Sequence, residues 1–183
     1  MPFDGPPSAP PASGSDAAEI AAAIAATITR TSSRWPALPA EHSTERTGAR
    51  VLSNETFDVW LLRWPRGTGV DPHDHGASVG GFAVVEGVLE EIRWRDGVRS
   101  SHVVRPGQVA TVERGVVHDV VGVTDGALSV HVYAPPLRAM TFYDESGQLA
   151  VRREVVDSAT MDAPTVREHP GPGIGRDRAK PAA

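Results

Sequence analysis

Short apolar runs, separated by turn residues at regular intervals, fill the chain between about residues 47 and 156. Examples are FDVWLLRW (57–64), GFAVVEG (81–87), VLEEIRWR (88–95), VVHDVVG (116–122) and ALSVHVYAP (127–135). Gly87 and the Asp96–Gly97 pair have the backbone freedom that tight turns need. Many strands without intervening helices are typical of an antiparallel sandwich or a closed barrel. The sequence therefore predicts a mainly β fold, and a barrel would have an interior able to hold a ligand.

Both ends of the chain differ in composition from this middle part. The first residues are rich in Pro, Gly and Ser, and the residues from Asp162 onward lose apolar periodicity. Asp16, followed three positions on by Glu19, resembles a capping pair that begins an Ala- and Ile-rich helix ending near residue 31. We therefore expect a disordered N-terminus (1–15), one globular domain (16–161) and a flexible C-terminal tail (162–183).

Charge and composition exclude several classes of function. The 183 residues carry a formal net charge of -5 without a basic stripe that could neutralise phosphates, so no nucleic-acid partner is expected. No apolar run is long enough to cross a bilayer, and the Pro-rich start lacks the basic and apolar regions of a secretory signal. The chain has no cysteine, which excludes disulfides and any site built on thiolates. These features predict a cytoplasmic protein without a nucleic-acid or membrane partner.

His73-Asp74-His75 is the first motif with chemical content. Positions i and i+2 of a strand face the same side about 6.6 Å apart, so the two imidazoles can converge on one ion while Asp74 faces away. On its own, the motif is equally compatible with two surface histidines in a polar loop. His118, in a later strand-like run, offers a third ligand.

The residues around these histidines resemble the two-part signature of the cupin superfamily. Its glycines match Gly67, Gly87, Gly107 and Gly115, and its histidines match His73, His75 and His118. Gly80, Glu113 and Gly122 stand where the signature has Glu, Pro and Asn. The resemblance implies a cupin-type double-stranded β-barrel, here preceded by an N-terminal helix. The missing Glu removes the usual carboxylate ligand and leaves three neutral histidines.

Three neutral ligands leave a divalent ion its full positive charge, so the predicted site favours an anionic substrate. If the histidines occupy one face of an octahedron, the other three positions stay open for a chelating substrate and dioxygen. Ferrous iron suits this arrangement, because the related non-haem oxygenase site combines two His with one carboxylate. Zinc on three histidines is the alternative, since imidazole suits zinc equally well.

The stretch from about residue 44 to 145 is similar to the cysteine dioxygenase family of thiol dioxygenases. The most specific pieces are WPRGTGVDPHDHGASVG (64–80) and SVHVYAPPLRAM (129–140). The resemblance implies an Fe(II) enzyme that adds both atoms of O2 to a thiol and forms a sulfinic acid. It therefore favours iron over zinc as the cofactor. Animal members carry, at the position of Gly80, a cysteine that crosslinks to the tyrosine, so this chain resembles the bacterial members instead.

Ser129, His131 and Tyr133 fit the Ser-x-His-x-Tyr triad of that family, and at i, i+2 and i+4 of one strand they face the same side. The resemblance implies that Ser129 orients His131, which hydrogen-bonds the Tyr133 hydroxyl beside the reacting thiolate and oxygen. A half-polar strand face at a barrel mouth is the other interpretation. Arg50 falls where the family places the arginine that binds the substrate carboxylate, and Arg46 is a possible substitute.

Three functions stay open at this point. The first is a cysteine dioxygenase that forms cysteine sulfinate, and the second is a dioxygenase for another small thiol such as 3-mercaptopropionate. The third is a non-catalytic metal-binding cupin that senses a small anion. Arg50 favours an amino-acid substrate, and the complete triad weighs against a protein that only binds. The expected partners are a small-molecule thiol and O2, and the expected state is a monomer or a small homo-oligomer.

Overall fold

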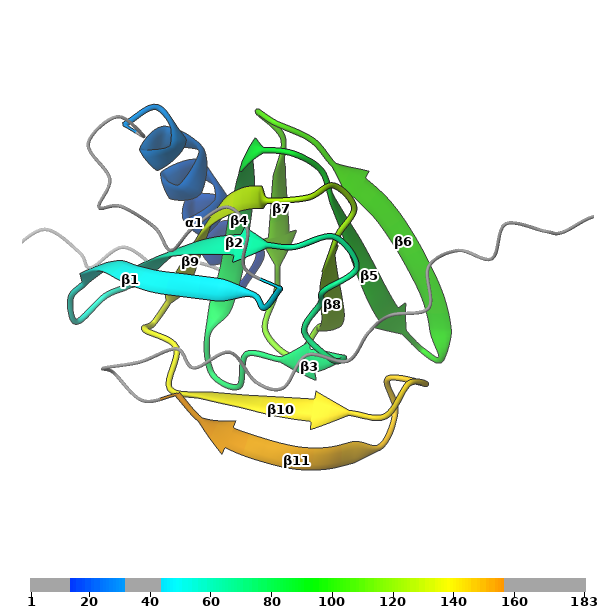
Figure 1. Ribbon diagram of the computed structural model, residues 1–183. Helices are drawn as coiled ribbons and strands as arrows, with labels where there is room; N and C mark the ends of the chain where they lie inside the picture. The colour runs from blue at the N-terminus through cyan, green and yellow to red at the C-terminus, as the bar shows by residue number, and fades with distance from the viewer. Residues whose placement is uncertain (1–13, 32–43, 157–183) are drawn as a thin grey trace, which may run out of the picture.

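The computed structural model of the protein describes residues 14–31 and 44–156 (Figure 1). Within these residues one helix, α1 (Gly14–Thr29), precedes eleven strands. The strands are β1 (Thr47–Ser53), β2 (Asp58–Trp64), β3 (His73–Asp74), β4 (Val79–Glu86), β5 (Leu89–Arg95), β6 (Val98–Val104), β7 (Val109–Val112), β8 (Val117–Gly122), β9 (Ala127–Ala134), β10 (Ala139–Tyr143) and β11 (Ala150–Val155).

The strands form two antiparallel sheets that face each other. One sheet has the order β1-β2-β9-β4-β7, and the other has the order β11-β10-β3-β8-β5-β6. Large side chains of both sheets meet in one apolar core, with Trp60, Trp64 and Phe82 from the first sheet and Leu89 and Phe142 from the second. Figure 1 shows the two sheets curving around this common interior. The predicted mainly β, double-stranded barrel with an N-terminal helix is confirmed.

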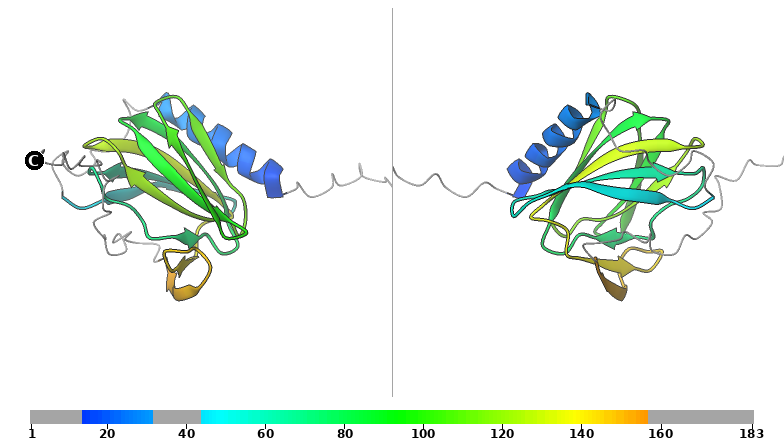
Figure 2. Two further views of the ribbon diagram at one scale, coloured as in Figure 1. Left: turned by 90° about the vertical axis from the view of Figure 1, so that its right-hand side faces the viewer. Right: turned by 60° about the vertical axis from the view of Figure 1, so that its left-hand side comes forward.

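The first sheet is buried on both faces. Along β2, Trp60 and Leu62 face the barrel interior, whereas Val59 and Leu61 face outward, because strand side chains alternate. The outward side chains form a second apolar cluster with alanines of α1. The helix therefore lies across the outside of this sheet and contacts β4, β7 and β9 (Figure 2).

The helix lies close to the sheet because its inner stripe consists of alanines. Ala18, Ala21, Ala22 and Ala25 recur at helical spacing and are each at most 3% exposed. Opposite them, Gly81 of β4 has no side chain, and a Cβ atom there would lie only 2.7 Å from Cα of Ala22. Small residues on both elements thus let the two backbones meet without a side-chain layer between them.

The predicted strands agree with β2, β4, β5, β8 and β9 to within two residues at each end. The predicted turns are also present. Gly87, Asp96 and Gly97 all have positive φ angles, of 71°, 51° and 75°. Asp96 and Gly97 connect β5 to β6 in a two-residue hairpin, which requires this left-handed backbone.

The predicted start of the helix was wrong. The helix α1 begins at Gly14, so Asp16 lies in the first helical turn instead of preceding it as a cap. A carboxylate there still interacts favourably with the positive end of the helix dipole. The structure does not describe residues 1–13 of the predicted N-terminal segment (1–15). The predicted tail (162–183) also lies outside the described residues. Within residues 14–31 and 44–156, no helix is long and apolar enough to span a membrane.

The close contact between α1 and β4 yields a prediction. Ala22→Leu should lower the free energy of unfolding by about 1–3 kcal/mol, because the added atoms have no space beside Gly81. Ala23→Leu, one position along on the exposed face, should change it by less than about 0.5 kcal/mol. Urea unfolding of the two variants measures the difference. Equal stabilities would show that the helix does not pack on the sheet in this way.

Candidate metal centre

Three buried histidines meet in the barrel interior. His73 lies in the short strand β3 directly opposite His118 of β8, and His75 follows directly after β3 ends. Each ring contributes one nitrogen atom, and these three nitrogens all lie within 4.8 Å of one another. All three side chains are at most 3% exposed. The structure therefore brings together the three predicted metal ligands.

Hydrogen bonds on the far side of two rings determine which nitrogen faces inward. The Nδ1 atom of His73 lies 2.9 Å from the carbonyl oxygen of Asp71, and Nδ1 of His118 lies 2.9 Å from Oε1 of Glu91. A carbonyl or a carboxylate can only accept, so both Nδ1 atoms carry the proton. The Nε2 atoms of His73 and His118 are therefore the nitrogens left to bind a metal ion.

The geometry and protonation of the three rings fit a metal ion. The Nε2 atoms of His118 and His75 lie 3.1 Å apart. Two nitrogens bound at about 2.1 Å to one ion at right angles are separated by about 3 Å. Burial, together with the nearby His118, lowers the pKa of His73 and His75 well below the usual value of 6.5. Both rings are thus neutral, as metal ligation requires.

Asp74 points away from the three histidines. Its Oδ1 accepts a hydrogen bond of 2.8 Å from the Gly76 backbone, and its Oδ2 accepts one of 2.6 Å from the Tyr143 hydroxyl. This second bond raises the pKa of Tyr143 to about 12. The alternation of side chains along His73-Asp74-His75 therefore separates two ligands from a structural carboxylate.

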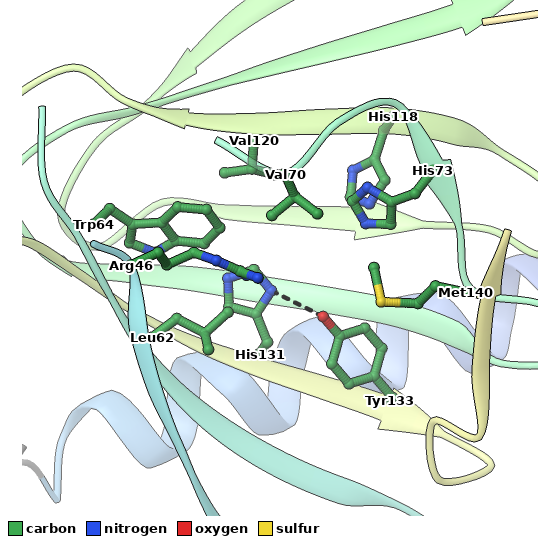
Figure 3. A pocket seen from close by; sticks show the side chains of 10 residues that line it. All are labelled: Arg46, Leu62, Trp64, Val70, His73, His118, Val120, His131, Tyr133 and Met140. Atoms are coloured by element: carbon green, nitrogen blue, oxygen red, sulfur yellow. Dashed lines mark hydrogen bonds between the residues drawn. The ribbon is translucent and has the colours of Figure 1, made fainter. Parts of the chain in front are cut away.

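A pocket opens beside the three histidines, between the two sheets (Figure 3). Its enclosed part is small, with room for about one water molecule. Its polar lining comes from both sheets and from the residue preceding β1, and comprises Arg46, His73, His118, His131 and Tyr133.

Ser129, His131 and Tyr133 form a hydrogen-bonded chain along β9 that begins at Trp64. The indole Nε1 of Trp64 donates to Ser129 Oγ over 2.8 Å, and Ser129 Oγ lies 2.9 Å from Nε2 of His131. The Nδ1 atom of His131 lies 3.4 Å from the Tyr133 hydroxyl, which Figure 3 shows beside the pocket. The structure thus places the three predicted residues in one network and adds Trp64 to it.

Trp64 determines the direction of this chain, because an indole N–H can only donate. The buried Ser129 hydroxyl accepts that bond, and Nε2 of His131 is its only other hydrogen-bond contact in the described structure, so its proton is donated there. Burial lowers the pKa of His131 well below 6.5, so the ring is neutral and carries its single proton on Nδ1. His131 then donates to the oxygen of Tyr133, and the Tyr133 proton is not used within this chain. Burial also raises the pKa of Tyr133, so the hydroxyl keeps that proton.

The two candidate arginines occupy different places. Arg46, directly before β1, is 5% exposed and lines the pocket, with its guanidinium carbon 5.1 Å from the Trp64 ring centre. Arg50 lies opposite Trp60 in the β1–β2 ladder, and its guanidinium carbon is 5.5 Å from that ring. Four residues of strand separate them by about 13 Å. Arg46, the predicted substitute, is the one that lines the pocket, and Arg50 is not among the lining residues.

Comparison with known proteins decides the family. A family model described as cysteine dioxygenase type I matches residues 13–146. The chain belongs to this cysteine dioxygenase family. Membership indicates a thiol dioxygenase of the cupin type, as the resemblance of the sequence motifs implied.

Several solved structures are similar to this chain over about half of its length. KdgF from Halomonas sp. has 17% sequence identity and a TM-score of 0.47, covering 55% of this chain and 88% of its own. The protein TT1209 from Thermus thermophilus has 21% identity and a TM-score of 0.48, covering 54% and 91%. A cupin superfamily protein from Desulfitobacterium hafniense has 10% identity and a TM-score of 0.45, covering 51% and 80%.

Gly80, where animal cysteine dioxygenases carry the crosslinking cysteine, lies between a metal ligand and the tyrosine. A Cβ atom at Gly80 would lie 3.1 Å from Nδ1 of His75 and 3.5 Å from Cδ1 of Tyr133. Any side chain at position 80 would therefore require the His75 ring to shift by a few tenths of an ångström. The absence of a side chain at position 80 is compatible with a ligand set made of histidines alone.

Glu91 was not predicted from the sequence as part of the site. It lies on β5 and is 0% exposed, with its carboxylate against His118. Burial alone would raise the pKa of Glu91, but the hydrogen bonds and charges of His118 and Arg93 outweigh it and lower the pKa. One signal was available in the sequence. Glu91 alternates with Ile92 and shares a strand face with Leu89, which predicts an inward-facing carboxylate.

The convergence of three neutral imidazoles predicts metal binding by this group. His118→Ala should weaken binding of a divalent ion by more than about 100-fold. Loss of a residue that only hydrogen-bonds to a metal ligand typically weakens binding by about 10- to 100-fold, and loss of the ligand itself should cost more. His131→Ala, which removes a buried histidine of the same pocket, should still bind one equivalent. Calorimetric titration with Co²⁺ measures both. Stoichiometric, tight binding by the His118 variant would contradict the assignment of the site.

Proposed function

We propose that the protein is a ferrous iron-dependent thiol dioxygenase that converts cysteine to cysteine sulfinate. The observation that carries this proposal is a buried cation, Arg46, in the same pocket as His73, His118 and Tyr133. One pocket thus offers a metal site for a thiolate and a cation for a carboxylate. Cysteine bears both groups on neighbouring carbons, and membership of the cysteine dioxygenase family supports the same substrate class.

His73, His75 and His118 would hold the iron, which supplies the redox chemistry that lets a thiolate react with dioxygen. The overall reaction, R–SH plus O2 giving R–SO2H, places both oxygen atoms on sulfur. It therefore needs no further electron donor. The remaining work of the protein is to bind the substrate, orient it, exclude water and hold one proton in place.

Arg46 is suited to binding a carboxylate because none of the described residues that line the pocket is acidic, and the nearby carboxylate of Asp119 is not among them. Burial lowers the pKa of Arg46 to about 10, which still leaves the guanidinium charged at neutral pH. Its buried Nε has no hydrogen-bond partner among the described residues. A buried charge and a buried unpaired donor are both unfavourable until an anion enters. Figure 3 shows the guanidinium extending into the pocket beside His131 and Tyr133.

Tyr133 would supply a hydrogen-bond donor at the reacting sulfur and oxygen atoms. The direction of the Trp64–Ser129–His131 chain leaves the Tyr133 proton free to point into the pocket. The Phe82 ring stacks on His131 with a centroid separation of 4.9 Å and keeps the imidazole plane in position. A donor held in this way loses little entropy when the substrate arrives.

The rest of the pocket wall is apolar. Leu62, Val70, Val120 and Met140 close it on several sides and limit the water that can remain around a bound thiolate. A dry site strengthens the attraction between Arg46 and a carboxylate, because charges interact more strongly at low dielectric. It also protects a reactive sulfur species from hydrolysis.

A second substrate, 3-mercaptopropionate, is favoured by one observation. No carboxylate belongs to the described lining of the pocket, so the protein offers no acidic partner to a substrate amine. A thiol with a carboxylate but no amine would use the same metal site and the same arginine. A non-catalytic anion sensor is less well supported, because it has no need of a proton chain directed at the pocket.

Oxygen consumption by the iron-loaded protein tests the proposal directly. Cysteine should be oxidised to its sulfinate, with one O2 consumed per thiol, and cysteamine should react poorly because it lacks a carboxylate. Faster turnover of 3-mercaptopropionate than of cysteine would move the assignment to the second substrate. Absence of oxygen uptake with all three thiols would contradict a dioxygenase and support a binding protein.

The two arginines provide a matched pair of variants for the same assay. Arg46→Met should lower kcat/KM for cysteine by at least about 30-fold, equivalent to about 2 kcal/mol for a lost buried charge pair. Arg50→Met should leave it within about threefold, a change of less than about 0.7 kcal/mol. Thermal unfolding of both variants checks that each is folded, since Arg46 also interacts with the buried carboxylate of Asp119. Equal effects of the two variants would exclude Arg46 as the carboxylate ligand.

The proton chain predicts a remote effect of Trp64. Trp64→Phe should lower kcat about 5- to 100-fold, the equivalent of about 1–3 kcal/mol for an unsatisfied buried group, while metal affinity stays unchanged. Tyr133→Phe should likewise lower kcat and leave metal affinity unchanged. Trp60→Phe, which removes the other buried indole of β2, should have a much smaller effect, because Trp60 makes no hydrogen bond with Ser129, His131 or Tyr133 in the described structure. Similar rates for both tryptophan variants would remove Trp64 from the chain.

A further inference from the structure

Glu91 places a carboxylate directly behind one of the three metal ligands. Its Oε1 accepts the hydrogen bond of 2.9 Å from Nδ1 of His118. Its Oε2 lies 2.9 Å from Nη2 of Arg93 and 3.0 Å from Nε2 of His102. The Glu91 side chain is fully buried, whereas that of His102 on the edge strand β6 is half exposed. The carboxylate is thus held between the metal ligand and two donors.

The partners of Glu91 determine the direction of its hydrogen bonds. Arginine can only donate, and Arg93 is itself anchored because Nη2 also donates to the carbonyl oxygen of Thr111 on β7. An ionised carboxylate can only accept, so His118 has to donate from Nδ1. The unprotonated Nε2 of His118 then faces His75 and the common metal site.

Glu91 also changes the charge around the site. The ligand set consists of three neutral imidazoles, and Gly80 offers no carboxylate where the cupin signature has one. Glu91 lies one hydrogen bond farther out and places a full negative charge beside the ring of His118. A carboxylate bonded to a ligating histidine raises the basicity of that ligand and fixes the orientation of its ring.

We propose that Glu91 is a positioning residue of the metal centre, which holds His118 in the tautomer that presents Nε2 and supplies the negative charge absent from the ligand set. This inference rests on the proposed function, because it assumes that the three histidines bind a metal. It assigns to Glu91 an effect on metal affinity and on redox potential that is separate from substrate binding by Arg46.

Glu91→Gln tests the tautomer. A glutamine has only one acceptor oxygen, and Arg93 requires an acceptor, so the amide NH2 group would turn toward His118. His118 would then accept at Nδ1 and carry its proton on Nε2, where it blocks metal binding. Glu90→Gln is the matched control, since Glu90 is the neighbouring carboxylate on the same strand and points to the opposite face.

Three measurements give the expected results. Nitrogen-15 NMR of the metal-free protein should show the Nδ1–H tautomer of His118 in the wild type and in Glu90→Gln, and the Nε2–H tautomer in Glu91→Gln. Calorimetric titration with Co²⁺ should show about 10- to 100-fold weaker binding for Glu91→Gln only. The midpoint potential of the iron-loaded Glu91→Gln protein should rise, because a nearby negative charge no longer stabilises the ferric state.

Glu91→Asp controls for misfolding. It keeps the charge on a shorter side chain and should retain the Nδ1–H tautomer, with an affinity between those of the wild type and Glu91→Gln. An unchanged tautomer and unchanged Co²⁺ affinity in Glu91→Gln would overturn the inference and leave the proposed dioxygenase intact. Conversely, a wild-type protein that binds Co²⁺ but consumes no O2 with any thiol would overturn the proposed function and still permit the test of Glu91.

Discussion

Three buried imidazole nitrogens directed at one point are the constraint on which the rest of the site depends. His73 and His118 face each other across the β3–β8 ladder, and His75 joins them from the residue after β3. Burial keeps His73 and His75 neutral. Unpaired lone pairs in a dry interior are unfavourable until a cation satisfies them. Three such nitrogens could hold a metal ion, and the neighbouring side chains lie around this point.

Charge is distributed unevenly about this centre. Arg46 places a positive charge on the pocket side, where a substrate enters, and Glu91 places a negative charge behind His118, on the protein side. With a metal ion bound, an anionic substrate would meet two cations, the metal and the guanidinium, without a carboxylate among the described lining residues. The same asymmetry explains how a ligand set without Glu at position 80 can still hold a divalent ion.

Two donor-only side chains determine the direction of the hydrogen bonds in the site. Trp64 donates into the Ser129–His131 chain and leaves the Tyr133 proton available to the pocket. Arg93 donates to Glu91 and so makes His118 donate from Nδ1. In each case a residue outside the site decides which atom carries a proton inside it. Neither tryptophan nor arginine can reverse its role, so each network has one orientation.

Much of the fold could be predicted from the sequence by itself, because the strands follow from local periodicity, whereas the grouping of His118 with His73 and His75 came from the resemblance to the cupin signature. Alternation with period two gave the strands, the common face of His73 and His75, and the common face of Ser129, His131 and Tyr133. Glycine and Asp-Gly spacing gave the turns. The helix begins at Gly14, before the predicted cap at Asp16, since a carboxylate is favourable inside the first turn as well as at the cap.

Only the tertiary structure decided which residues meet across strands. Arg46 and Arg50 share a face, and it is the register of β1 against β2 that puts Arg46 beside Trp64 and Arg50 beside Trp60. The contacts of Trp64 with Ser129 and of Glu91 with His118 likewise depend on the pairing of β2 with β9 and of β5 with β8. Periodicity assigns a side chain to a face, but a neighbour across the sheet is set by long-range register, which the whole core determines.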